Sequence, residues 1–154
     1  MAASLALATS LAVGCAPATE PFDRTQASAD AVRTVLLSEL SNVDEDPQMK
    51  HLFLRLLGDV TVEALVLHSV PSAILSANDS VRSPTPERHV LHKLTGARGG
   101  LVTVDLATAT WEAARVTFEV HTAFSPTFAW STRVTVDTDR TPPEIVASEV
   151  TEQA

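Results

Sequence analysis

The residue with the most distinctive chemistry in this 154-residue chain is Cys15, its only cysteine. A single thiol excludes an internal disulfide and a zinc site built on cysteines, because both need more than one. Cys15 ends an uncharged apolar run, Met1 to Gly14, and small and acidic residues follow it. This setting indicates a secretion signal that ends in a cysteine for lipid attachment.

The run from Met1 to Gly14 is too short to cross about 30 Å of hydrocarbon as a helix, but it has the length of a signal-peptide core. It resembles a bacterial lipoprotein signal at Leu11, Ala12, Val13, Gly14 and Cys15, which read LAVGC. The resemblance implies an exported protein held at the outer or cell-surface membrane by acyl chains on Cys15. Two alternatives stay open: a plain secretory signal cleaved near Ala16 or Ala18, and an ordinary apolar N-terminus.

Composition limits the partners of the chain. Its formal net charge is −8, whereas binding to nucleic-acid phosphates needs a basic face, so we expect no nucleic-acid partner. The same charge disfavours adsorption to anionic lipid, so membrane contact should come through Cys15. Hydrophobic residues make up 45% of the chain, which is enough for a folded core.

The chain divides by composition into four parts. Residues 1–15 form the signal segment with its lipobox-like end. Residues 16–30 are polar with two prolines and are typical of a flexible tether. We expect residues 31–139 to form one β-sandwich domain, with 31–57 as an alternative helical lead-in, and residues 140–154 to be a linker or tail.

The part before Gly58 fits two kinds of secondary structure. Val32 to Leu40 suits one face of a helix or a short strand. Met49 to Leu57 has helical apolar spacing and also alternates like a strand. We favour a strand, followed by a hairpin turn at Gly58-Asp59 and a second strand over Val60 to Val70.

From Arg88 onward the pattern predicts antiparallel β structure. Apolar and polar residues alternate over Arg88 to Leu94, Leu101 to Leu106, Ala114 to His121 and Phe128 to Asp137, with turn residues between them. Evenly spaced strands of this kind are typical of a β-sandwich. We expect Trp130 to be buried between two sheets, in phase with the apolar residues of its strand.

The stretch from Gly100 to Ile145 resembles the C-terminal half of bacterial Ig-like repeats, which occur in exported and cell-surface proteins. The likeness rests on the strand pair GLVTVDL and ARVTFEV and on the ending TVDTDRTPPEI, where a strand runs through Asp-Thr to a proline. It implies an Ig-like antiparallel sandwich that serves as a structural or adhesion domain.

Few other residues suggest chemistry. Asp137 and Asp139 are candidates for calcium at a domain junction, with a solvated turn as the alternative. His89 and His92 are three apart and would diverge on a strand, so we expect scattered surface histidines and no metal site. No GxSxG or SxxK motif supplies a nucleophile and no phosphate-binding loop is present, so we expect no catalytic residue and no cofactor.

The sequence therefore favours a non-enzymatic structural or adhesion module, anchored by Cys15, with a protein or carbohydrate surface partner. The alternative is a small module that binds carbohydrate or peptidoglycan, for which Trp111 would have to be exposed beside polar loop residues. A secreted hydrolase is the weakest hypothesis, because it would need a pocket that gathers histidine and aspartate.

Overall fold

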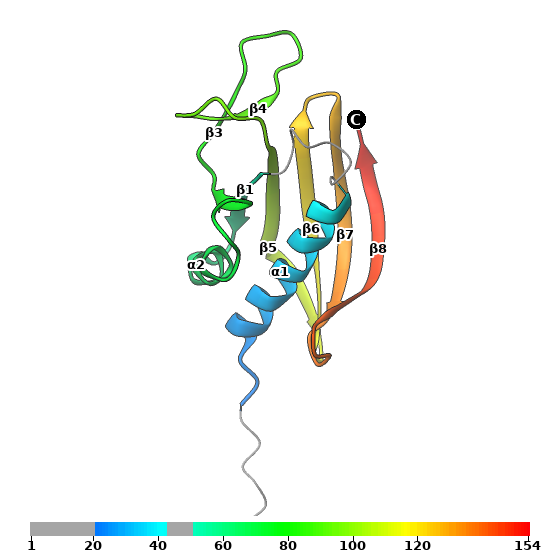
Figure 1. The fold of residues 1–154 in the computed structure, drawn as a ribbon. Coiled ribbons are helices and arrows are strands. Elements are labelled where there is room, and N and C mark those ends of the chain that lie inside the picture. The colour runs from blue at the N-terminus through cyan, green and yellow to red at the C-terminus, as the bar shows by residue number, and fades with distance from the viewer. Residues whose placement is uncertain (1–20, 43–50) are drawn as a thin grey trace, which may run out of the picture.

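The computed structural model describes residues 21–42 and 51–154, and within these ranges the protein is mostly β (Figure 1). The elements in chain order are α1 (Arg24–Asn42), β1 (Leu52–Leu57), α2 (Val60–Ser69), β2 (Leu75–Ala77), β3 (Ser80–Arg82), β4 (Val90–His92), β5 (Gly100–Glu112), β6 (Arg115–Ser125), β7 (Phe128–Asp137) and β8 (Glu144–Gln153).

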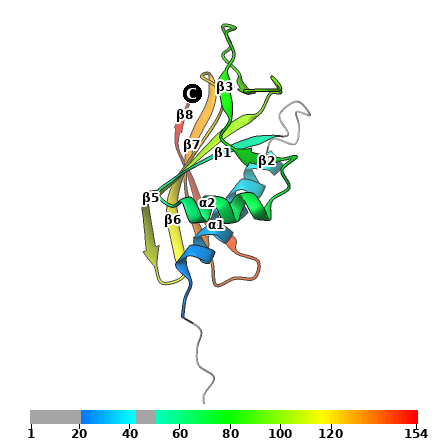
Figure 2. The same cartoon turned by 90° about the vertical axis from the view of Figure 1, so that its left-hand side faces the viewer.

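In this part of the chain the main sheet is mixed and six-stranded, with the order β2-β1-β5-β6-β7-β8, and β3 and β4 form a separate small sheet. Strand β1 is parallel to both β2 and β5, and the strands from β5 to β8 are antiparallel neighbours. Parallel neighbours need a crossover between them, which α2 supplies between β1 and β2. Helices α1 and α2 lie on the same side of the main sheet (Figure 2).

The region around Gly58 corrects the predicted hairpin. The predicted strand before Gly58 is confirmed as β1, but Val60 onward forms α2 instead of a second strand. Asp59 caps this helix, because its carboxylate accepts from the backbone N–H groups of Thr61 at 2.8 Å and Val62 at 3.2 Å. Val62 and Val66 are then one turn apart and buried.

Gly58 makes the sharp step from β1 into α2. Its φ is +111°, and a Cβ at this position would lie 2.7 Å from the backbone nitrogen of Ala107. A side chain is therefore excluded both by backbone conformation and by the close approach of β5. Gly58 is thus needed where the chain passes close to β5, and it does not form the two-residue hairpin turn that the sequence predicted.

Helix α1 begins inside the segment predicted as a tether. Asp23 caps it by accepting from the backbone N–H groups of Thr25 and Gln26, at 2.9 and 3.1 Å. Val32, Val35 and Leu36 are fully buried against the sheet, which establishes the helical alternative for this stretch. The predicted tether boundary at residue 30 is therefore wrong for residues 24–30.

The expected Ig-like sandwich differs from the observed architecture. The alternating apolar faces of β5, β6 and β7 are present, but α1 and α2 cover them where a second sheet was expected. Alternation shows which face is buried and not what buries it, so either layer satisfies it. Residues 144–153, predicted as part of a linker or tail, form β8 at the edge of the same sheet.

Candidate functional site

A groove with a volume of about 320 Å³ lies between α1 and the last two strands of the sheet. Helix α1 contributes Val35, Ser38 and Glu39 to its walls. Strand β8 contributes Ile145, Ser148 and Val150, and β7 forms the floor. In Figure 1, α1 runs diagonally across β6 and β7, and β8 follows at the edge of the sheet.

The register of β8 decides which of its side chains face the groove. Val150 is opposite Thr132 and Ser148 is opposite Val134, both on the face of β7 that α1 covers. Val150 is 59% exposed, although it lies beside the buried floor. An apolar residue therefore stays in contact with solvent at the open side of the groove.

Glu39 is the polar group set most deeply into this groove, with only 8% of its surface exposed. The hydroxyl of Thr122 on β6 donates to its Oε2 atom at 3.0 Å. Burial raises the pKa of the Glu39 carboxyl above its usual value, and the side chains of Thr122 and Trp130 act in the opposite direction by favouring the charged form. Of these two side chains, Thr122 lowers the pKa of Glu39 more.

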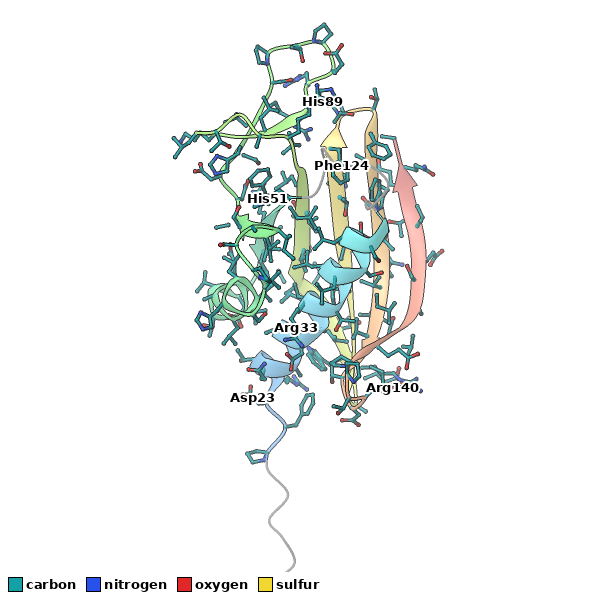
Figure 3. The ribbon with its side chains drawn as sticks, in the orientation of Figure 1. Asp23, Arg33, His51, His89, Phe124 and Arg140 are labelled. Atoms are coloured by element: carbon teal, nitrogen blue, oxygen red, sulfur yellow. The ribbon has the colours of Figure 1, made fainter. Side chains whose placement is uncertain are left out.

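Three aromatic rings continue the apolar surface beyond Glu39. Phe124, Phe128 and Trp130 have ring centroids 5.4 to 5.9 Å apart, and Phe128 is 48% exposed. Figure 3 labels Phe124 near the turn between β6 and β7. Trp130 is partly buried and lines the groove beneath α1, so the prediction that it lies between two sheets is corrected.

Strand β8 has an irregular free edge. Its pairing with β7 skips Val146 and Thr151, which leaves one regular stretch, Ala147 to Val150, between the two irregularities. This stretch carries two of the three groove residues of β8, Ser148 and Val150. Glu149 lies within it and is opposite Arg133, on the other face of the sheet.

The two aspartates proposed for calcium lie at the far end of the sheet, close to Arg140 (Figure 3). The Asp137 carboxylate is 3.5 Å from the Arg115 guanidinium and 3.7 Å from that of Arg140. The Asp139 backbone N–H donates to Asp137 at 3.2 Å. These arginines already supply the opposite charge and would repel a metal ion, which favours the alternative of a solvated turn.

The histidines are used in local packing. His92 accepts from the backbone N–H groups of Leu94 and Thr95 and contacts the ring of Phe53. His51 contacts the Ala73 carbonyl and the Ser76 hydroxyl. Within residues 21–42 and 51–154, no three His, Cys, Asp or Glu side chains are grouped so that they could hold a metal ion.

Trp111 and Cys15 lie away from the groove residues in the chain. Trp111 is partly buried and packs edge-on against Phe22, with the Arg24 guanidinium 5.7 Å from its ring centre. It is therefore not an open platform beside polar loop residues. Cys15, the predicted lipid-attachment site, lies outside the described residues.

Sequence reasoning did not identify Glu39 or the groove. Glu39 follows Val35 by one helical turn, so it lies on the face that Val32, Val35 and Leu36 bury. The signal in the sequence that could have identified Glu39 is a lone carboxylate on an otherwise apolar helix face. The groove itself depends on β8, which was predicted to lie outside the domain.

Comparisons with known proteins return no relationship: no family model, no curated protein and no solved structure matches the chain. Of the helices in the described residues, none is long and apolar enough to cross a membrane.

Proposed function

We propose that this protein is a non-enzymatic binding module of the cell surface, exported and held at a membrane by acyl chains on Cys15. In this proposal its groove receives an extended segment of another protein, which adds to the sheet along β8. One observation carries the proposal: the groove between α1 and β7 opens directly beside the free edge of a ten-residue strand.

Strand addition explains why a groove and an edge would occur together. An edge strand presents backbone N–H and C=O groups to a partner strand, and pockets for alternate side chains provide specificity. A segment paired with Ala147 to Val150 would place every second side chain on the face of Ser148 and Val150. Those side chains would enter the open side of the groove, next to Glu39 and Trp130.

The same edge disfavours pairing between two copies of the chain. Glu144, Glu149 and Glu152 lie along β8, and the net charge of −8 makes two copies repel each other. The skipped residues Val146 and Thr151 limit regular pairing to a short stretch. A different protein with a compatible segment is therefore the occupant that we propose.

A display library of random ten-residue peptides tests this function. The selection uses the Cys15→Ser protein, which cannot carry the lipid. We expect extended peptides that bind the parent protein and bind a Ser148→Trp variant at least tenfold more weakly, because the indole fills the groove. The matched control is Ala147→Trp, which places the same ring opposite Thr135 on the other face and should leave binding unchanged.

Two results would contradict the proposal. Peptides that bind the Ser148→Trp and Ala147→Trp variants equally well would show that the groove is not the binding site. A library that yields no binder, together with retention of the protein on purified peptidoglycan, would favour the carbohydrate-binding alternative.

A further inference from the structure

We infer that the segment bound in the groove carries a lysine or arginine side chain and that Glu39 binds its positive charge. This inference rests on the proposed function and names the chemistry of the partner. It begins with the lining of the groove: among the lining residues that the structure describes, Glu39 is the only charged one. The rest are apolar side chains, hydroxyls and the indole of Trp130.

The setting of Glu39 is poor for a carboxylate without a cation. Only 8% of its surface is exposed, and the groups that favour its charged form are both neutral: the Thr122 hydroxyl, which donates to Oε2, and the side chain of Trp130. A buried charge is costly unless an opposite charge or several hydrogen bonds compensate it. A basic side chain entering from the open side of the groove would supply the opposite charge in a place where water screens it weakly.

The nearby arginines of the sheet are engaged elsewhere. Arg133 contacts Glu119 at 2.8 Å on the face of the sheet away from α1. Arg140 contacts Glu144 at 2.7 Å and lies beside Asp137, at the opposite end of the sheet from Phe124 (Figure 3). The cation that would complement Glu39 is thus best supplied by the ligand.

Trp130 provides a second reason for a basic side chain. Its indole lines the same groove, and a Lys or Arg head group near an indole face gains from the cation–π attraction. The long apolar stem of either side chain suits the intervening surface of Val35 and Val150. A divalent metal ion fits less well, because a single carboxylate provides too few oxygen ligands.

The charge of the surrounding surface agrees with this choice. Glu149 and Glu152 lie on β8 near the groove, and the whole chain has a net charge of −8. Such a field attracts a basic segment and speeds its encounter with the edge strand. The acidic edge and the acidic groove therefore select for the same ligand chemistry.

Three peptide libraries that differ at one position test the inference. Their central residue is fixed as Lys, as Met, which has a similar length and no charge, or as Glu. We expect the Lys library to yield the strongest binders of the parent protein. Replacing that Lys by Met in a selected peptide should weaken binding at least tenfold on the parent protein and less than threefold on a Glu39→Gln variant.

Glu149→Gln is the matched control, because it removes one negative charge from the same edge on the face away from the groove. It should retain most of the preference for Lys. Thermal melting of each variant verifies that it is folded before binding is measured.

The outcomes separate this inference from the proposed function. If binders come equally from all three libraries and Glu39→Gln binds them unchanged, yet Ser148→Trp abolishes binding, the groove binds peptides and the charge inference is wrong. If no library yields a binder that depends on Ser148, the proposed function fails and this inference fails with it. An equal loss of the Lys preference in Glu149→Gln would show a general effect of charge and would also overturn the role of Glu39.

Discussion

Thr122 of β6 donates its hydroxyl to the carboxylate of Glu39 on α1 at 3.0 Å, and this bond joins residues that are 83 positions apart in the chain. It fixes the N-terminal helix to the centre of the C-terminal strands. It also holds the one carboxylate of the groove in place. The bond therefore serves both the packing of α1 and the proposed binding of a cation.

Glu39→Gln should stabilise the protein at neutral pH. The pKa of Glu39 is raised, so the folded protein holds this proton more tightly than the unfolded chain. The resulting stability is fully present below the ordinary pKa and is lost as the pH rises through the raised pKa. Glutamine removes the buried charge and can still accept from Thr122.

Thermal melting at pH 7 and pH 4 measures this effect. We expect Glu39→Gln to melt above the parent protein at pH 7, by roughly 2–4 °C for each kcal/mol gained, and the difference to shrink at pH 4. An equal shift at both pH values would show that the carboxylate does not titrate in the way its burial implies.

Thr122→Val should destabilise the protein at pH 7. Valine keeps the shape of the side chain but leaves the buried carboxylate without its donor, which costs roughly 1–3 kcal/mol. Urea unfolding of Thr122→Val, Glu39→Gln and the double variant gives the coupling between the two sites. Additive effects would indicate that the Thr122 hydroxyl stabilises the carboxylate no more than the neutral amide that replaces it.

The sequence predicted the strands in which apolar and polar side chains alternate. It did not predict all of the elements that pack against these strands. Leu101 to Leu106 and Phe128 to Asp137 lie within observed strands, and Ala114 to His121 does so from Arg115 onward. Val60 to Val70 is rich in β-branched residues, which predicts a strand. The Asp59 cap and the burial of Val62 and Val66 outweigh that preference, because intrinsic propensities are small compared with packing.

The groove was beyond sequence reasoning for a different physical reason. It lies between α1, near the start of the described chain, and β7 and β8, at its end, so it depends on contacts between segments far apart in the sequence. Residues of β8 are almost all exposed, so they lack the apolar alternation that marks a strand with one buried face. Glu39 alone could have been flagged, as a charge on an apolar helix face.

The turn into α2 gives a third prediction. Gly58→Ala should cost more than 1 kcal/mol, because φ at this residue is +111° and the new Cβ would lie 2.7 Å from the Ala107 nitrogen. Urea unfolding measures the loss. Gly96→Ala is the matched control: φ is also positive there, but a Cβ would have no atom within 4 Å, so its cost should be smaller.

Calcium should leave the thermal stability of the protein unchanged. Asp137 lies between Arg115 and Arg140, and their positive charges oppose a cation at this turn. A metal present at 100 times its dissociation constant would add about 2.7 kcal/mol, which melting would detect. Melting in EDTA and in millimolar calcium is the measurement. An increase with calcium that Asp137→Asn with Asp139→Asn removes would restore the calcium hypothesis.

Lipidation at Cys15 is the prediction on which the surface location depends. Stable membrane attachment needs two or more acyl chains, because a single chain binds only marginally. Cells that express the protein and are fed an alkyne analogue of palmitate should label the parent protein and not Cys15→Ser. The parent protein should sediment with membranes, and the variant should be in the soluble exported fraction.

Intact mass separates the alternatives: a mature chain that begins at Cys15 and carries lipid supports anchoring, whereas an unmodified chain that begins shortly after Cys15 shows plain secretion. In the second case the groove would act in a free protein, and the proposed display at the membrane would be wrong even if peptide binding holds.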